Sequence, residues 1–262
     1  MADYDRLLVI ARDAARKAMQ ALVTIDNRST SYKYADDLPR EMKSPVDYRL
    51  EEIIFEQLKP TGISILSEES GTQIGSSNIG LRWVVDPLDG TVNFIRGLAP
   101  CAVSIALWLD DAPVFGVISE NPTCRLAWGG PSLGAFIEAS PIHVSAIQER
   151  SQAVLCTGFP SRFDFAGASE SNFWKMVSSY SKVRMLGTAS LSLLQVARGS
   201  ADAYFEDQIM LWDVAAGLAI IQGAGGNYTI DPVSTTRACR VMAANNILLC
   251  SFDDSEYGLQ PK

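Results

Sequence analysis

Acidic side chains recur along the sequence at places where predicted strands end or a predicted helix begins. These residues are Glu68, Asp86, Asp89, Glu206 and Asp213. Binding sites are usually built at strand ends and helix starts, so these carboxylates are candidates for one common site. Oxygen ligands without histidine or cysteine partners favour Mg²⁺, Mn²⁺ or Ca²⁺ over zinc. The residue types therefore predict a site for a hard divalent cation.

The segment 86–90 reads Asp-Pro-Leu-Asp-Gly and holds two of these carboxylates close together. Pro87 restricts its own φ and Gly90 permits a tight turn, so the carboxylates and the carbonyls between them can converge on one point. Two like charges held that close repel each other unless a cation lies between them. A plain turn, in which Asp86 and Asp89 cap backbone donors, is an alternative that this segment alone leaves open.

Two other acidic residues can likewise be interpreted either as part of a site or as caps of backbone donors. Asp213 precedes a run of small residues and is a good N-cap for a helix. Asp47 likewise suits the N-cap of the helix that we predict from that residue onward. Taken alone, each residue indicates a helix start, and a cap can also serve a site.

Three longer segments resemble, in order and sequence, the inositol monophosphatase family of Mg²⁺-dependent, lithium-sensitive phosphatases. They are Ser-Glu-Glu-Ser at 67–70, Trp-Val-Val-Asp-Pro-Leu-Asp-Gly-Thr-Val-Asn-Phe at 83–94, and Leu-Trp-Asp-Val-Ala-Ala-Gly at 211–217. Shorter similarities lie at 134–136, 157–160, 187–189 and 201–204. The resemblance covers about residues 47 to 230, and the combination of motifs is highly specific.

The resemblance implies a cofactor and a set of ligands for it. Two or three Mg²⁺ ions are expected, with Mn²⁺ as a possible replacement. The expected ligands are Glu68, Asp86, the carbonyl of Leu88, Asp89 and Asp213. Bound divalent ions of this kind lower the pKa of water and neutralise phosphate oxygens during in-line displacement.

The resemblance also implies roles in catalysis and in substrate binding. Thr91, hydrogen-bonded to Asp47, would position and deprotonate the attacking water, and Glu68 would act beside them. The backbone amides of Gly90 and Thr91 would receive the phosphate. The hydroxyls of the departing alcohol would meet Glu206 and Ala189.

We therefore expect a phosphomonoesterase that releases phosphate from a small sugar or polyol monophosphate, similar to inositol monophosphate. The stretch 187–194 carries no base that could hold a second phosphate, and Glu206 would repel one. The alternatives are a bisphosphatase for fructose 1,6-bisphosphate or adenosine 3',5'-bisphosphate, and a histidinol-phosphate phosphatase. A module that binds a divalent cation without catalysis is an alternative from a different class.

The sequence departs from the family in the loop before Asp47. Family members usually carry a lysine about eleven residues before that aspartate and a threonine two before it, where this chain has Asp36 and Pro45. Lys33 and Lys43 are nearby but out of register. Whether this loop supports a metal site of its own stays open.

A second phosphatase chemistry is suggested by Cys156 and Arg162, which have the Cys-x5-Arg spacing of cysteine-dependent phosphatases. That loop must direct successive N–H groups at a phosphate, and Pro160 removes one of them. We interpret the spacing as a coincidence. His143 is the only histidine, which excludes a Ser-His-Asp triad and a His-Glu-x-x-His zinc site.

The elements that must position these residues divide the chain into two halves. Periodicity predicts helices at 7–22 and 47–58, a hairpin or loop at 25–46, and strands at 63–66, 82–85, 102–109, 114–119 and 125–128. After residue 150 the predicted strands are 153–157, 183–186, 203–206, one near 228 and 247–250, and the predicted helices are 170–181, 191–198 and 213–222. We expect an α+β half (1–149) with a largely antiparallel sheet and an α/β half (150–262) within a single domain, 1–262. The resemblance implies a layered αβαβα sandwich of the inositol monophosphatase and fructose-1,6-bisphosphatase type.

Composition narrows the function classes further. The net charge of −8 disfavours binding to nucleic acid backbones. Five scattered cysteines suit a reducing cytoplasm, and no export signal or membrane anchor is found. The expected partner is a small phosphorylated metabolite, and the resemblance suggests a homodimer.

Overall fold

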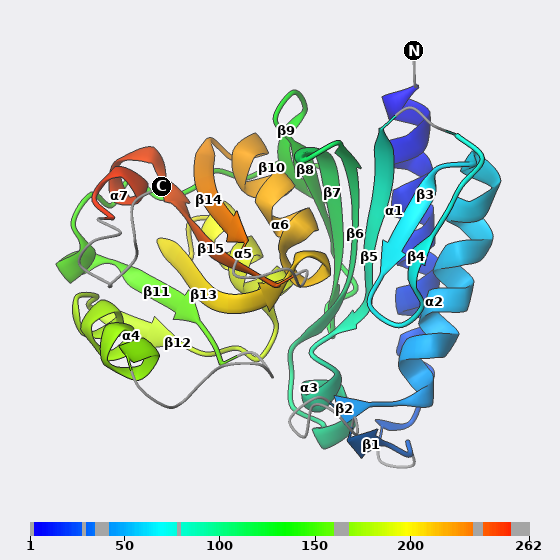
Figure 1. Ribbon diagram of the computed structural model, residues 1–262, viewed down its shortest axis with the longest axis horizontal. Coiled ribbons are helices and arrows are strands. Elements are labelled where there is room, and N and C mark those ends of the chain that lie inside the picture. The colour runs from blue at the N-terminus through cyan, green and yellow to red at the C-terminus, as the bar shows by residue number, and fades with distance from the viewer. Residues whose placement is uncertain are drawn as a thin grey trace.

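Helices and sheets alternate in five layers in the computed structural model of this protein (Figure 1). The structure describes residues 3–27, 30–34, 42–77, 80–159, 168–232 and 238–252. An outer pair of helices covers a large sheet, a central pair separates it from a smaller sheet, and the last helices lie on the outer face of that sheet. The predicted αβαβα sandwich is confirmed.

The outer pair consists of α1 (Tyr4–Leu22) and α2 (Pro45–Leu58). The apolar face of α1 is buried at the spacing that the sequence predicts, and Asp3 caps the helix by accepting from the backbone N–H of Arg6 at 3.1 Å. The helix α2 begins at Pro45 and not at Asp47, because Ser44 is its N-cap. Both helices bury their apolar faces against the large sheet.

The large sheet contains eight strands within the described residues, in the order β10-β9-β8-β7-β6-β5-β3-β4. They are β3 (Ser64–Ser67), β4 (Gly71–Gln73), β5 (Leu81–Asp89), β6 (Cys101–Leu109), β7 (Ala112–Asn121), β8 (Leu126–Gly130), β9 (Gly134–Ile137) and β10 (Ser140–Pro141). Neighbouring strands are antiparallel except β3 and β5, which are parallel. The predicted, largely antiparallel sheet is confirmed, although the short strands β4, β9 and β10 were not predicted.

The strand β5 is longer than the sequence predicts. It continues through Asp86 to Asp89, with an irregular register against β6 between these two residues. The predicted strand end at Val85 is therefore wrong, although Asp86 Oδ1 does accept from the N–H of Leu88 at 3.0 Å, as the alternative of a capped turn expects. A bulge re-aims side chains without ending the strand, so the acidic residues remain part of the rigid sheet. After Gly90 the chain enters the short helix α3 (Thr91–Arg96).

The small sheet contains five strands within the described residues, in the order β12-β11-β13-β15-β14. They are β11 (Val154–Thr157), β12 (Lys182–Arg184), β13 (Ala203–Met210), β14 (Gly226–Pro232) and β15 (Ala238–Asn245). The helices α5 (Ala189–Ala197) and α6 (Leu211–Gly223) lie between the sheets, and α4 (Ala168–Ser178) and α7 (Asn246–Cys250) lie outside. The sheet is mixed, because β11 is parallel to both its neighbours and β15 is antiparallel to both of its own.

One predicted strand of the second half is wrong. Residues 247–250 belong to α7, and the strand of that region is β15. Asn245 caps α7, since its side-chain oxygen accepts from the N–H groups of Ile247 and Leu248 at 3.0 Å each. A short apolar run does not distinguish a buried strand from a helix turn.

The central helix α6 lies directly on the large sheet. A Cβ atom added to Gly116 of β7 would lie 2.2 Å from the carbonyl oxygen of Ala216, which no side chain tolerates. Glycine at this position thus allows helix and strand backbones to touch. This contact holds the N-terminal half of α6 against the large sheet.

The remaining elements are small. The predicted hairpin or loop at 25–46 contains the two-residue strands β1 (Lys33–Tyr34) and β2 (Met42–Lys43), which pair antiparallel below α2 and beside α3 (Figure 1). The 3-10 turns are η2 (Lys59–Thr61) and η3 (Arg150–Gln152). His143 is exposed and lies outside the described strands. No described helix has the length and apolar character needed to cross a bilayer.

Candidate active site

Three of the predicted acidic residues meet at one point between the large sheet and the central helices. Glu68 follows β3, Asp86 lies in β5, and Asp213 lies in the first turn of α6. Each offers an oxygen, and these three oxygens all lie within 4.8 Å of one another. We call Glu68, Asp86 and Asp213 the carboxylate cluster.

The fold explains why these three residues meet. The strands β3 and β5 are adjacent and parallel, with Ser67 opposite Val85, and the N–H of Glu68 donates to the carbonyl of Val85 at 3.2 Å. Asp213 occupies the third position of α6, where its Oδ2 accepts from the N–H of Met210 at 3.1 Å. Asp213 is therefore not the N-cap itself, and its first-turn hydrogen bond fixes its orientation.

The charges around the carboxylate cluster are unbalanced. Burial raises the pKa of Glu68 well above its ordinary value, and the neighbouring carboxylates of Asp213, Glu69 and Asp47 raise it further. Burial also raises the pKa of Asp86 well above its ordinary value, followed by the charges of Glu68, Asp89 and Asp213. A buried set of oxygen donors with like charges fits a hard divalent cation, which would supply the missing positive charge.

Asp89 has a different environment from the carboxylate cluster. Its Oδ2 accepts hydrogen bonds from the hydroxyls of Thr188 and Ser190 and from the N–H of Ser190 at 2.8 Å. Its Oδ1 accepts from the N–H of Ala189 at 3.3 Å. Burial raises the pKa of Asp89, and these hydrogen bonds oppose that rise. Asp89 therefore connects the large sheet to the start of α5.

Asp47 and Thr91 form the pair that the resemblance implies. The Thr91 hydroxyl lies 2.7 Å from Asp47 Oδ1 and 3.0 Å from the carbonyl oxygen of Leu88. Asp47 Oδ2 accepts from the Ser44 hydroxyl at 2.6 Å and from the Ser44 N–H at 3.2 Å. Asp47 is thus the third residue of a capping box and not the N-cap. Burial raises its pKa, while the bonds from Ser44 and Thr91 lower it.

The turn between β5 and α3 requires glycine. Gly90 has φ of +91°, and an added Cβ would lie 3.2 Å from the Cβ of Cys101 and 3.3 Å from the carbonyl oxygen of Gly187. Asn93 reinforces the turn by donating from Nδ2 to the carbonyls of Pro100 and Leu186 at 2.8 and 2.7 Å. The start of α3 is therefore held close to the segment that leads into α5.

Glu206 approaches the same region from the small sheet. It is buried in β13, next to a bulge opposite β15. Burial raises its pKa well above the ordinary value, and the charges of Asp213 and Asp89 raise it further. A Cβ added to Gly158 would lie 2.7 Å from Glu206 Oε1, so the end of β11 passes directly beside this carboxylate.

Several residues of this region had no role in the sequence prediction. Thr188 and Ser190 hold Asp89, Ser44 holds Asp47, and Asn93 connects the start of α3 to neighbouring segments. Only the role of Ser44 could have been predicted from spacing, because Ser44 and Asp47 are three residues apart, as the two members of a capping box are. The family similarity at 187–189 implies no role for the hydroxyl of Thr188.

The competing cysteine chemistry finds no support at Cys156. This cysteine is buried, and burial raises the pKa of its thiol to about 11, so the thiolate that such chemistry needs is not formed at neutral pH. Pro160 and Arg162 lie outside the described residues. Asp36, the residue that departs from the family's loop lysine, also lies outside them, and Pro45 is the first residue of α2.

Comparison with known proteins identifies the family. A profile described as the inositol monophosphatase family matches residues 3–251. An inositol-1-monophosphatase of Caulobacter vibrioides is 35% identical over 226 residues, covering 83% of this chain and 86% of that protein. A fructose-1,6-bisphosphatase/inositol-1-monophosphatase of Aquifex aeolicus is 31% identical over 233 residues and covers 88% of each chain.

The fold comparison agrees with the sequence comparison. The crystal structure of the extragenic suppressor protein suhB from Bartonella henselae superposes with a TM-score of 0.85 at 31% identity. The match covers 94% of this chain and 96% of that one. The chain belongs to the inositol monophosphatase family.

Proposed function

We propose that this chain is a Mg²⁺-dependent phosphomonoesterase that hydrolyses a small sugar or polyol monophosphate, such as inositol monophosphate. The products are the free alcohol and inorganic phosphate. The observation that carries the proposal is the carboxylate cluster, with three oxygens within 4.8 Å. The name of the relative from Caulobacter vibrioides supports the same reaction class.

The metal would be held by the carboxylate cluster together with Asp89 and the carbonyl of Leu88. We propose two or three Mg²⁺ ions, with Mn²⁺ as a possible replacement. When bound, these ions would lower the pKa of water, neutralise phosphate oxygens and stabilise the leaving alkoxide. Asp89 already accepts several hydrogen bonds, so its remaining lone pairs are those available for a cation.

The proton of the attacking water would pass through Thr91. The hydroxyl of Thr91 donates to Asp47 Oδ1, which leaves its oxygen lone pairs able to accept a proton. Burial raises the pKa of Asp47 and so makes this carboxylate a better proton acceptor than an exposed one. Glu68 belongs to the carboxylate cluster and would help to orient the water.

The substrate would lie between the two sheets. The N–H groups of Gly90 and Thr91, at the start of α3, would receive the phosphate. Glu206 would accept hydroxyls of the alcohol, with Ala189 beside it. A carboxylate at this position accepts sugar hydroxyls and repels a second phosphate, which favours a monophosphate at the alcohol subsite.

The deciding experiment is a panel of phosphate esters assayed with and without Mg²⁺. Inositol monophosphate and hexose monophosphates should release phosphate in Mg²⁺, and EDTA should abolish the release. The panel should include fructose 1,6-bisphosphate, adenosine 3',5'-bisphosphate and histidinol phosphate, since the Aquifex relative's name includes a bisphosphatase. Turnover that continues unchanged in EDTA would refute the proposal. Mg²⁺ binding without any turnover would favour the non-catalytic module.

Three properties of the family extend the proposal. Li⁺ should inhibit turnover, and light scattering should report a homodimer. A reducing cytoplasm would suit the five cysteines, all of which are free thiols in this structure.

A further inference from the structure

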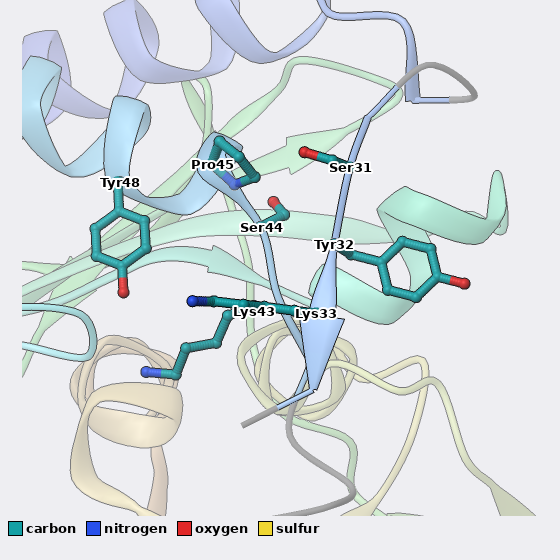
Figure 2. Close-up of a pocket in the computed structure, with 7 residues that line it drawn as sticks. All are labelled: Ser31, Tyr32, Lys33, Lys43, Ser44, Pro45 and Tyr48. Carbon is teal, nitrogen blue, oxygen red and sulfur yellow. The ribbon is translucent and has the colours of Figure 1, made fainter. Parts of the chain in front are cut away.

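A pocket beside the β1–β2 hairpin carries two lysine side chains (Figure 2). Its volume is about 480 Å³, large enough for a phosphate group. The residues that line it are Ser31, Tyr32, Lys33, Lys43, Ser44, Pro45 and Tyr48. We call this space the lysine pocket. None of the carboxylates of the cluster is among its described lining residues.

The two lysines are directly opposite each other on the hairpin. Lys33 of β1 pairs with Lys43 of β2, and both side chains extend to the side on which the ring of Tyr48 lies (Figure 2). Residues that face each other across an antiparallel pair lie on the same face of the ribbon, and like charges there are destabilising. An arrangement of this kind becomes favourable when an anion lies between the two ammonium groups.

The chain supplies one counter-charge at one side of the pocket. The Nζ of Lys43 lies 3.5 Å from Oε2 of Glu69, whose side chain is only 1% exposed. Lys33 is exposed and has no ion pair with any residue that the structure describes. The ammonium group of Lys33 is therefore the one that a bound anion would neutralise.

The lysine pocket adjoins the proposed proton path without being part of the metal site. Ser44 lines the pocket, and its hydroxyl donates to Asp47 Oδ2 at 2.6 Å. Asp47 Oδ1 in turn lies 2.7 Å from the hydroxyl of Thr91. An anion in the pocket would thus lie next to the proposed proton path.

We propose that the lysine pocket is a second oxyanion site that binds a phosphate group through Lys33 and Lys43. The hydroxyl of Ser31 also lines the pocket and suits one of the remaining phosphate oxygens, whereas the hydroxyls of Ser44 and Tyr48 already donate to Asp47 and Glu69. The occupant is either free inorganic phosphate or a second phosphate of the substrate. Only its assignment to a substrate rests on the proposed function.

The first experiment measures binding of inorganic phosphate by isothermal titration calorimetry to the full chain stripped of metal. Without metal, the carboxylate cluster disfavours phosphate at the reaction centre, and the part of the binding that depends on Lys33 reports the lysine pocket. Lys33→Gln removes a charge-assisted hydrogen bond and should weaken binding about tenfold. Lys33→Arg, which keeps the charge, should restore most of it.

The matched control is Lys182→Gln. Lys182 is also an exposed strand lysine, but it lies in β12, an edge strand of the small sheet and away from the β1–β2 hairpin (Figure 1). This variant should bind phosphate as the unaltered chain does. The proposal is overturned if the unaltered chain binds no phosphate, or if Lys33→Gln and Lys182→Gln bind it equally.

The second experiment identifies the source of the phosphate. KM is measured in Mg²⁺ for a hexose bisphosphate and for a hexose monophosphate. If Lys33→Gln raises the first KM several-fold more than the second, the occupant is the substrate's second phosphate. Equal effects on both, with calorimetric binding lost, assign the pocket to free phosphate. Because the calorimetry needs neither Mg²⁺ nor turnover, failure of the oxyanion site and failure of the proposed phosphatase are seen separately.

Discussion

Two sets of buried or half-buried carboxylates lie side by side in this protein and are stabilised differently. Asp89 and Asp47 each accept several hydrogen bonds from hydroxyl and backbone N–H groups of the chain. In the carboxylate cluster, the neighbouring charges that act on Glu68 and Asp86 are all negative. The comparison shows which carboxylates the polypeptide satisfies by itself and which ones suit an added cation.

The difference follows from what each element places nearby. The start of α5 brings two hydroxyls and two N–H groups to Asp89, whereas the ends of β3 and β5 and the start of α6 bring three carboxylates to one point. Burying a charge is costly unless the charge is hydrogen-bonded or paired with an opposite charge. Backbone N–H groups bond to Asp86 and Asp213, but the charges that raise the pKa of Glu68 and Asp86 are all negative, so the cluster suits an added cation.

The largest effect is expected for Asp86→Asn, which removes a charge from the centre of the cluster. Phosphate release should fall at least about 10³-fold, because charge stabilisation by the metal contributes several kcal/mol to the transition state. The assay is release of inorganic phosphate at saturating Mg²⁺. Asp111→Asn, at an exposed turn, is the control and should leave turnover unchanged. If Asp86→Asn and Asp111→Asn were equally active, the carboxylate cluster would not be the metal site that distinguishes it from Asp89 and Asp47.

The next largest effect tests the hydrogen-bonded set. Thr91→Val removes the hydroxyl that bonds to Asp47 and should lower kcat about 10²- to 10³-fold, the range of general-base catalysis. Thr91→Ser keeps the hydroxyl and should retain most of the activity. The thermal midpoints of both variants should be compared with the unaltered chain. If valine and serine variants had the same kcat, the proton path through Thr91 would be wrong.

Mg²⁺ itself should distinguish the two sets through stability. The folded-state pKa of Asp86 is raised above its ordinary value of 3.8, so its contribution to stability is present at low pH and is lost as pH rises above that value. In metal-stripped protein, Asp86→Asn should therefore gain stability relative to the unaltered chain as pH rises from about 4 to neutral. At neutral pH, Mg²⁺ at a hundred times its Kd should stabilise the unaltered chain by about 2.7 kcal/mol.

Thermal unfolding of both proteins across this pH range, with and without Mg²⁺, provides the measurement. Asp86→Asn should show a much smaller gain from Mg²⁺ at the same concentration. A stability difference between the two proteins that stays constant at all pH values would mean that folding does not raise the pKa of Asp86.

The smallest effect is expected at the support of Asp89. Ser190→Ala removes one hydroxyl donor and should lower kcat/KM about tenfold, the value of one hydrogen bond to a charged group. Ser192→Ala is a closely matched control, because Ser192 is buried in the same helix but donates to the backbone carbonyl of Thr188. The measurement is kcat/KM of Ser190→Ala and of Ser192→Ala by steady-state kinetics over a Mg²⁺ titration. Identical profiles would show that Asp89 does not depend on the hydroxyl of Ser190.

The sequence predicted the layers better than the exact start of each element. Periodicity located α1 and most strands, since local hydrophobic patterns decide them. It placed Asp47 and Asp213 at N-caps, whereas both are third residues of their helices, because a cap and a capping box share the same residue types. It ended β5 too early, because Asp-Pro and Asp-Gly are typical of turns and the partner strand that keeps them in the sheet is distant in sequence.

The candidate site shows the same limit. The acidic residues and Thr91 could be found from motif resemblance, and their proposed roles stay predictions, as does the division into halves at residue 150. The bonds from Thr188 and Ser190 to Asp89 join residues about a hundred positions apart. No local pattern reports such a contact, which arises only when α5 docks on the end of β5.

The separation in sequence of Glu68, Asp86 and Asp213 has a consequence for the order of events during folding. The last of these residues reaches the first two only after α6 has docked on the large sheet, where Gly116 meets Ala216. A nascent or partly folded chain therefore lacks the cluster and cannot use Mg²⁺ as a nucleus. We expect Mg²⁺ to slow unfolding strongly and to leave the refolding rate nearly unchanged.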